Sequence, residues 1–246
     1  MTADALPRVR VAAHAKVNLA LRILAREEGG HHQLETDFHR LALADEVTVS
    51  LTHGDGIAFT SDATFDIPPA QNLAVRAAVA YVQAAAWPHR GIAIHVAKRI
   101  PMGGGLGGGS ADAGAVLRGL DALNPAPLGE ATLVRIATPL GADVPFLATT
   151  APRVLAWGRG ERMLALPPLA DVTVHLACFD AGVHTGHAYG WLADARAAAP
   201  ASVSGALHDA GALSQLRAVR GIASNAFEPV VGARRTGSRT ATRWCC

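Results

Sequence analysis

The chain has 246 residues, of which 50% are hydrophobic and 17% are charged, and its formal net charge is +2. This composition provides a buried core for one large domain or two small ones and argues against a disordered chain. The small net charge gives no electrostatic reason to expect a nucleic-acid partner or a membrane surface. No apolar run reaches the roughly eighteen residues of a membrane span, so we expect none.

The cysteines and the first residues bear on the compartment. Cys178, Cys245 and Cys246 form neither a disulfide framework nor the spacing of a metal site. The opening stretch MTADALPRVRV lacks the apolar core of a signal peptide. Both observations favour the reducing cytoplasm.

Hydrophobic periodicity predicts strands and helices in irregular alternation. The expected strands lie at residues 16–23, 46–51, 91–98, 153–158 and 172–179, and the expected helices at 72–87, from the glycines to 123, at 129–141 and at 184–198. In the first strand, Lys16 and Asn18 lie opposite an apolar face that starts at Val17. The stretch around 196–212 predicts a loop or weak helix. Without strict strand–helix alternation, the mixture favours an α+β fold.

The most informative stretch is PMGGGLGGGS, in which only Leu106 interrupts the glycines Gly103–Gly109. Such a loop lets backbone N–H groups approach an anion, and the helix that follows adds the positive end of its dipole. Ser110 stands where an N-cap is expected, and its hydroxyl could instead serve a phosphate or a metal. A tight turn without a ligand is the alternative, but one or two glycines would suffice for it. We therefore predict a phosphate cradle.

Three familiar phosphate-binding patterns do not fit this loop. No lysine follows the glycines, which excludes the P-loop. Gly103, Gly105 and Gly108 formally match the dinucleotide fingerprint, but that site needs a further strand after the helix, and the sequence there predicts a second helix. The motifs that accompany the glycine loop of protein kinases are also absent.

The loop resembles the second motif of the GHMP kinases, the small-molecule kinases of the galactose, homoserine, mevalonate and phosphomevalonate type. AKVNLALRI resembles their first motif, and GGHHQLET, QNLAVRAA and LGADVPFL match in order and spacing. Together these stretches, over about residues 12–192, are similar to the GHMP kinases that act in the non-mevalonate isoprenoid pathway. The resemblance implies a two-domain α+β fold: an ATP-binding domain like ribosomal protein S5 domain 2 at 1–155, an incomplete ferredoxin-like domain at 156–232, and a disordered tail at 233–246.

The resemblance also implies an activity, the ATP-dependent phosphorylation of the 2-hydroxyl of 4-diphosphocytidyl-2-C-methyl-D-erythritol. Phosphoryl transfer needs positioning, charge neutralisation and an acceptor for the hydroxyl proton. The match assigns that proton to Asp143, with Lys16 beside it to orient the hydroxyl; a plain capping or turn aspartate is the alternative. The implied cofactors are ATP and Mg²⁺, the implied partners are small molecules alone, and the chain is expected to be a monomer or homodimer.

The resemblance also implies residues that bind the nucleotide. Ser110 is expected near Mg²⁺, which arrives with ATP because the sequence shows no side-chain cage for a metal. Asn72 could equally be a helix cap, and Lys98 a solvated charge at a strand end. The expected ATP-binding residues are Asn72, Lys98, Pro101, Gly103, Gly104, Gly105, Leu106, Gly107, Gly108, Gly109 and Ser110.

The cytosine of the implied substrate needs a hydrogen-bonding partner and rings on which to stack. The resemblance assigns the edge of the base to His32 and one stacking face to His31, which replaces the usual tyrosine. Tyr189 is expected on the opposite face, and Thr185 and Asn18 complete the expected substrate site. Adjacent histidines in a loop are otherwise plain surface, and a metal would need a third ligand.

The last residues depart most from the family pattern. TGSR at 236–239 resembles a remnant of a third glycine-rich motif, with Arg239 where a glycine is expected. We therefore expect a truncated or frame-altered second domain. Two interpretations stay open: an active small-molecule kinase, and a catalytically impaired remnant that binds nucleotide.

Overall fold

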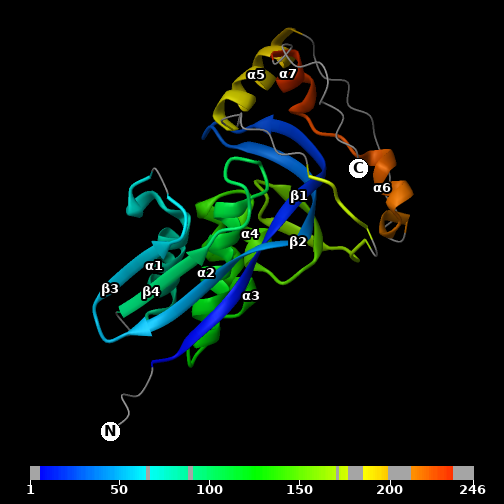
Figure 1. Ribbon diagram of the computed structural model, residues 1–246. Coiled ribbons are helices and arrows are strands. Elements are labelled where there is room, and N and C mark those ends of the chain that lie inside the picture. The colour runs from blue at the N-terminus through cyan, green and yellow to red at the C-terminus, as the bar shows by residue number, and fades with distance from the viewer. Residues whose placement is uncertain are drawn as a thin grey trace.

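A computed structural model describes residues 6–64, 67–87, 91–169, 172–176, 185–198 and 212–234. Its centre is one mixed sheet, and helices pack against one face of it (Figure 1). The strands are β1 (Arg8–Arg26), β2 (His32–Thr52), β3 (Gly56–Ser61), β4 (Gly91–Ala97), β5 (Arg153–Gly158) and β6 (Arg162–Ala165). The helices are α1 (Leu73–Ala85), α2 (Gly108–Leu123), α3 (Glu130–Ala137), α4 (Val144–Ala148), α5 (Thr185–Ala198), α6 (Leu216–Ile222) and α7 (Glu228–Arg234), with short 3-10 turns at Pro69–Gln71, Thr138–Leu140 and Ala212–Ser214.

The long strand β2 organises the sheet. Along one edge it pairs antiparallel with β1 over almost the whole length of both strands. Along its other edge, the half at 46–52 pairs with β4 and the half at 34–39 pairs with β5. β3 lies parallel to β4, with α1 in the connection, and β6 continues the sheet beyond β5. This arrangement leaves the middle of β1 beside the helices that follow the glycine loop.

Irregular pairing in β1 decides which side chains point inward. The register with β2 shifts between His14 and Lys16 and again between Asn18 and Ala20. A bulge adds a residue on one strand and re-aims the side chains next to it. As a result Ala15 and Lys16 are both buried although they are neighbours. Lys16 is therefore buried even though strict alternation places it opposite the apolar face of the strand.

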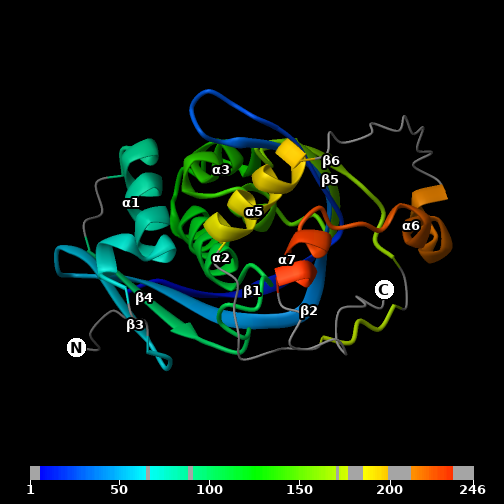
Figure 2. The same cartoon turned by 90° about the horizontal axis from the view of Figure 1, so that it is seen from above.

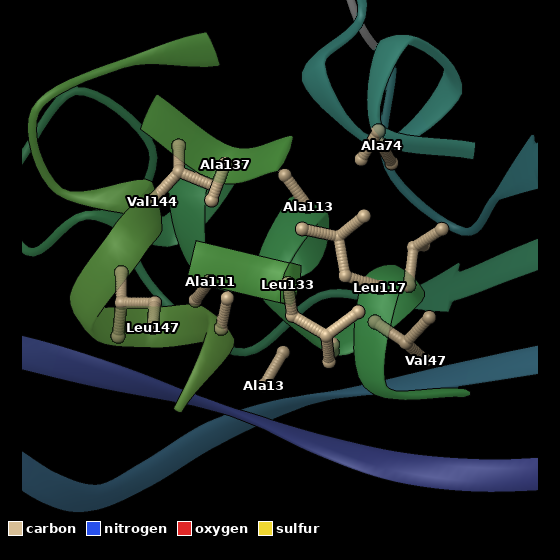
Figure 3. Close-up of a cluster of buried hydrophobic side chains, with 14 of the residues drawn as sticks. Ala13, Val47, Ala74, Ala111, Ala113, Leu117, Leu133, Ala137, Val144 and Leu147 are labelled. Carbon is tan, nitrogen blue, oxygen red and sulfur yellow. The ribbon is translucent and has the colours of Figure 1, made fainter. Parts of the chain in front are cut away.

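The core lies between the sheet and helices α1–α4. Figure 3 shows Leu117 of α2 and Leu133 of α3 within this cluster, together with Val47 of β2 and Leu147 of α4. Each fully buried side chain of this size contributes roughly 1.5–3 kcal/mol. Small residues let the elements approach closely: a Cβ added at Gly114 would lie 2.4 Å from the backbone of Leu147. The close contact fixes α4 against α2.

A second, smaller apolar cluster joins the C-terminal helices to the hairpin of β1 and β2. Its buried members are Ile23, Leu34 and Leu192, and Tyr189 and Phe227 pack against them. Figures 1 and 2 show α5 and α7 next to each other over this end of the hairpin. Helices α5 and α7 are far from the hairpin in sequence, so only the folded chain brings them into contact with it.

Most of the elements predicted from periodicity are present, and the α+β class is confirmed. The strand expected at 172–179 is wrong over its described part, since residues 172–176 have no strand neighbour and form no regular structure. The 155/156 boundary falls inside β5, and the division into domains stays a prediction. Residues 199–211, in the stretch expected as a loop or weak helix, and 235–246, in the expected tail, lie outside the described residues. Among the described helices, none is both long and apolar enough to cross a membrane.

Candidate active site

The structure brings Lys16 and Asp143 together. Lys16 Nζ lies 3.3 Å from Asp143 Oδ2, and the exposed fractions of the two side chains are 7% and 29%. The ammonium is therefore enclosed by protein, while the carboxylate keeps a solvent-facing side that a ligand can reach. Asp143 stands immediately before α4, and its side chain caps no N–H group of that helix. The alternative of a capping aspartate is thus not supported by the geometry.

Asn18 continues the same chain of contacts. Its Oδ1 accepts a hydrogen bond from Lys16 Nζ at 2.8 Å, and its Nδ2 donates to Thr36 Oγ1 at 2.8 Å. Thr36 in turn donates to the carbonyl of Ala20 at 2.7 Å. The predicted face-sharing of Lys16 and Asn18 is confirmed as a direct contact. Thr36 was not predicted, because only the register of β2 against β1 places it there.

Two arginines anchor the far end of α4. Arg40 donates to the carbonyls of Phe146 and Thr149 at 3.2 and 2.9 Å, and Arg118 donates to Leu147 and Thr149. The last carbonyls of a helix lack partners within it, and cations are favourable at that end. The arginines therefore fix the short helix that follows Asp143. The sequence gives no signal for them beyond their charge.

The glycine loop encloses a cavity of about 150 Å³, lined by Lys98, Ile100, Pro101, Met102 and Gly103–Gly109. Gly103, Gly105 and Gly107 have φ of +74°, +72° and +73°, which side chains rarely adopt. A Cβ added at Gly107 would lie 3.0 Å from Lys16 Cε, so the loop passes directly over the Lys16 side chain. Ile100 and Met102 are lining residues that the sequence analysis did not single out.

The expected N-cap role of Ser110 is wrong. Helix α2 begins at Gly108, its N-cap is Gly107, and no side chain caps its first turn. The left-handed turn at Gly107 starts the helix early, so Ser110 lies in its third position. The first N–H groups of the helix are left without intrahelical partners. In the described part of the chain the Ser110 hydroxyl makes no hydrogen bond, so both it and these donors are available to an anion.

Lys98 is bound beneath the loop rather than solvated. Its Nζ contacts Asp45 Oδ2 at 2.5 Å and Asp112 Oδ2 at 2.8 Å, and its side chain is 8% exposed. Burial raises the pKa of Asp112 to about 7, although the Lys98 charge opposes the rise. Burial alone would lower the pKa of Lys98, but the two carboxylates outweigh it and raise that pKa. The ammonium lines the cavity while its charge is already neutralised by protein.

Asn72 is a helix cap. Its Oδ1 accepts from the N–H of Ala74 at 2.9 Å, at the start of α1, and the residue is buried. Of the two roles considered for it, the capping role is the one that the geometry supports.

The other end of the site is aromatic. The rings of His32 and Tyr189 are stacked, with centroids 4.1 Å apart and planes 20° apart. Burial lowers the pKa of His32, and the charges of Arg26 and Arg196 add to this. Burial raises the pKa of Tyr189, and the charge of Asp143 adds to the rise. Tyr189 is thus stacked with His32 and lies within electrostatic reach of the Asp143 carboxylate.

In this structure it is His32 that stacks on Tyr189, while His31 is exposed, and the placement of the base between His31 and Tyr189 stays a prediction. Thr185 begins α5, and its side chain lies outside the described residues. The sequence analysis does not name Phe227, whose ring is roughly perpendicular to that of Tyr189 with centroids 4.9 Å apart. No group of three or more metal-ligating side chains occurs among the residues described.

Comparison with known proteins shows the family to which the chain belongs. Residues 72–150 match the model of the GHMP kinases N terminal domain. A 4-diphosphocytidyl-2-C-methyl-D-erythritol kinase from Nitratidesulfovibrio vulgaris is 37% identical over 226 residues, which cover 91% of this chain and 78% of that protein. The chain belongs to this kinase family. The resemblance inferred from the motifs is therefore confirmed.

Two further comparisons agree with that assignment. A relative of the same name from Desulfotalea psychrophila is 44% identical over 162 residues, which cover 65% of the chain and 54% of the relative. The chain thus spans about half the length of that protein. The crystal structure of a 4-(cytidine 5'-diphospho)-2C-methyl-D-erythritol kinase has a TM-score of 0.67 at 34% identity and covers 93% of the chain and 79% of the crystallised one. The expected GHMP-kinase fold is confirmed.

Proposed function

We propose that the chain transfers the γ-phosphoryl group of ATP to the 2-hydroxyl of 4-diphosphocytidyl-2-C-methyl-D-erythritol. The observation that carries this proposal is the contact of Lys16 with Asp143 directly under Gly107 of the loop. A proton acceptor, a buried cation and a phosphate cradle then meet at one point. Phosphoryl transfer needs these three elements.

In this proposal the Asp143 carboxylate accepts the proton of the substrate hydroxyl as the hydroxyl oxygen attacks the γ-phosphorus. The bond between the γ-phosphorus and the bridging β-phosphate oxygen breaks, and ADP is the leaving group. Lys16, held by Asn18 and Asp143, supplies fixed positive charge beside the reacting oxygens. The contact with Asn18 restricts the long lysine side chain, so little ordering remains to be done when the substrate binds. The alternative acceptor, Asp112, is bound to Lys98 and is 3% exposed.

The nucleotide end fits ATP with Mg²⁺. Gly103–Gly109 line the cavity and the first turn of α2 has no side-chain cap, so the glycine amides and the first N–H groups of α2 suit phosphate oxygens. The Ser110 hydroxyl, which has no partner among the described residues, fits one ligand position of an ion that stays mainly on phosphate and water. When bound, Mg²⁺ neutralises the charge that develops on the phosphates. Lys98 supports the loop from below, since its ammonium is shared by Asp45 and Asp112.

The second interpretation, an impaired remnant that binds nucleotide, is less well supported. The four predicted or observed members of the catalytic chain, Thr36, Asn18, Lys16 and Asp143, are all in contact. A remnant that had lost catalysis would have no need of this arrangement. The family comparison, which extends over 91% of the chain, points the same way.

The test is the release of ADP from MgATP with and without 4-diphosphocytidyl-2-C-methyl-D-erythritol. We expect ADP release that depends on this substrate, and one new phosphomonoester per ADP by ³¹P NMR. Asp143→Asn should remove the turnover and keep ATP binding, whereas Asp55→Asn, in the exposed turn before β3, should change neither. ATP binding by the unmodified chain with no turnover above Asp143→Asn would establish the remnant interpretation instead.

A further inference from the structure

Tyr189 is held by rings from two directions. His32 lies parallel to it, and Phe227 meets it at an interplanar angle of 88° with centroids 4.9 Å apart. Edge-to-face contacts of this kind orient a ring as well as bury it. Tyr189 comes from α5, whereas Phe227 directly precedes α7 and His32 begins β2. The orientation of the tyrosine is therefore set by two other segments.

Phe227 is itself placed by the strand that carries the catalytic lysine. The N–H of Leu21 on β1 donates to the carbonyl of Ser224 at 2.7 Å, and the N–H of Ala226 donates to the carbonyl of Leu21 at 2.9 Å. Asn225 makes a bridge with Leu21, and its side-chain oxygen accepts from the N–H of Phe227 at 3.0 Å. The segment 224–226, which directly precedes Phe227, is thus docked on β1 at Leu21, three residues beyond Asn18.

We propose that Phe227 is a positioning residue, which fixes the plane of Tyr189 so that the tyrosine ring forms a preorganised platform for the pyrimidine base of the substrate. The inference rests on the proposed function. A platform that is already oriented loses less conformational entropy when a ligand stacks on it. Because β1 also carries Lys16, the docking of Phe227 on β1 ties the base platform to the reacting centre.

His32 cannot supply this orientation in the complex by itself. Its ring stacks on Tyr189 with centroids 4.1 Å apart, which leaves no room for a third ring between them. A pyrimidine that takes this face of Tyr189 displaces His32 from the stack. The contact of Phe227 with Tyr189 then persists, because the segment 224–226 before Phe227 is fixed on β1 independently of His32.

The test compares Phe227→Leu with Phe227→Tyr. Loss of the ring edge should raise the KM for the cytidine substrate about 3- to 10-fold, the size expected for one aromatic pair. The KM for ATP should change by less than about twofold, since the nucleotide binds at the other end of the site. Phe227→Tyr keeps the edge and should behave like the unmodified chain. Phe59→Leu, a half-buried phenylalanine of β3, is the matched control.

A double-mutant cycle separates positioning from general stability. If Phe227 acts through Tyr189, then Phe227→Leu should cause no further rise in KM on a Tyr189→Leu background. An additive effect, or an equal rise in both KM values, would overturn the proposal. If Phe227→Leu lowers the folded fraction, Phe227→Met takes its place in the same cycle.

Binding of cytidine 5'-diphosphate, measured by calorimetry, tests the inference separately from catalysis. The proposal expects weaker binding in Phe227→Leu than in Phe59→Leu, with ATP binding equal in the two. That result, with no phosphoryl transfer by the unmodified chain, would reject the proposed function and keep the platform. Unchanged binding in an active Phe227→Leu enzyme would reject the platform and keep the function.

Discussion

The two ends of the site are built in opposite ways. The proposed phosphate end is one contiguous loop, Gly103–Gly109, which offers backbone N–H donors. The proposed base end is assembled from β2, α5 and the segment before α7, and it offers side-chain rings. The first rests on the main core, and the second on a small separate cluster.

This difference matches what each end has to recognise. Phosphate is common to all nucleotides, and backbone donors with a helix dipole suffice to bind it. A pyrimidine has to be told apart from other bases, and this requires rings and side-chain hydrogen bonds in a set orientation. We therefore expect changes at the phosphate end and the reacting centre to abolish function, and changes at the base end to alter affinity and stability by smaller amounts.

The largest effect is expected between the two ends, at the reacting centre. Lys16→Met should lower kcat by roughly 10²–10⁴, similar to the loss in Asp143→Asn, because a buried cation and the base beside it act as a unit. The double variant should be little worse than either single one. Arg22→Met, further along β1 and paired with Glu35 at 3.3 Å, is the control. Multiplicative losses in steady-state kinetics would show that the two residues act independently.

Gly107→Val tests the phosphate end. The residue has φ +73°, and an added side chain would meet Lys16 and Leu147. We expect ATP affinity to fall by at least about 10²-fold, since a branched side chain also blocks the approach of phosphate to the backbone. Gly56→Val, at the remote start of β3, also has a positive φ, and its added Cβ would have no neighbour within 4 Å. Equal ATP affinity of the two variants by calorimetry would reject the cradle.

The contrast between the two ends also explains how far the sequence could predict the site. The glycine loop is local, so its composition alone indicated phosphate. Lys16 and Asp143 are 127 residues apart and only their resemblance to family motifs paired them. Thr36, Arg40 and Phe227 carry no local signal, because their roles depend on strand register and on the docking of distant segments. The N-cap at Ser110 was misplaced because positive φ at Gly107 starts the helix earlier than a side-chain cap would.

Arg118→Met probes how the reacting centre depends on the packing around it. Arg118 donates to carbonyls at the end of α4 and to Ala12 at 2.8 Å, so its loss should let α4 and the preceding Asp143 shift. We expect kcat to fall by about 10- to 10²-fold, the cost of a small misplacement, with the KM for ATP unchanged. Arg135→Met, an exposed arginine of α3, is the control. A loss of kcat that persists on the Asp143→Asn background would mean that Arg118 acts elsewhere.

The smallest effect concerns pH at the base end. Burial against Tyr189, with the charges of Arg26 and Arg196, lowers the pKa of His32 in the folded chain. Below its ordinary pKa of about 6.5, the unfolded chain binds a proton that the folded chain disfavours, so this residue makes folding less favourable as pH falls. Between about pH 7.5 and about pH 5.5, the melting temperature of the unmodified chain should therefore drop more than that of His32→Gln.

The neighbouring histidine makes the comparison specific. His31 is exposed and outside the stack, so His31→Gln should keep the full pH dependence of the unmodified chain. If His31→Gln removes the dependence as well, general charge at the hairpin causes it and the stack with Tyr189 does not. If only His32→Gln removes it, the aromatic contact is present in solution without ligand. The base end would then differ from the phosphate end in a further respect, because the His32 ring covers Tyr189 before any substrate binds.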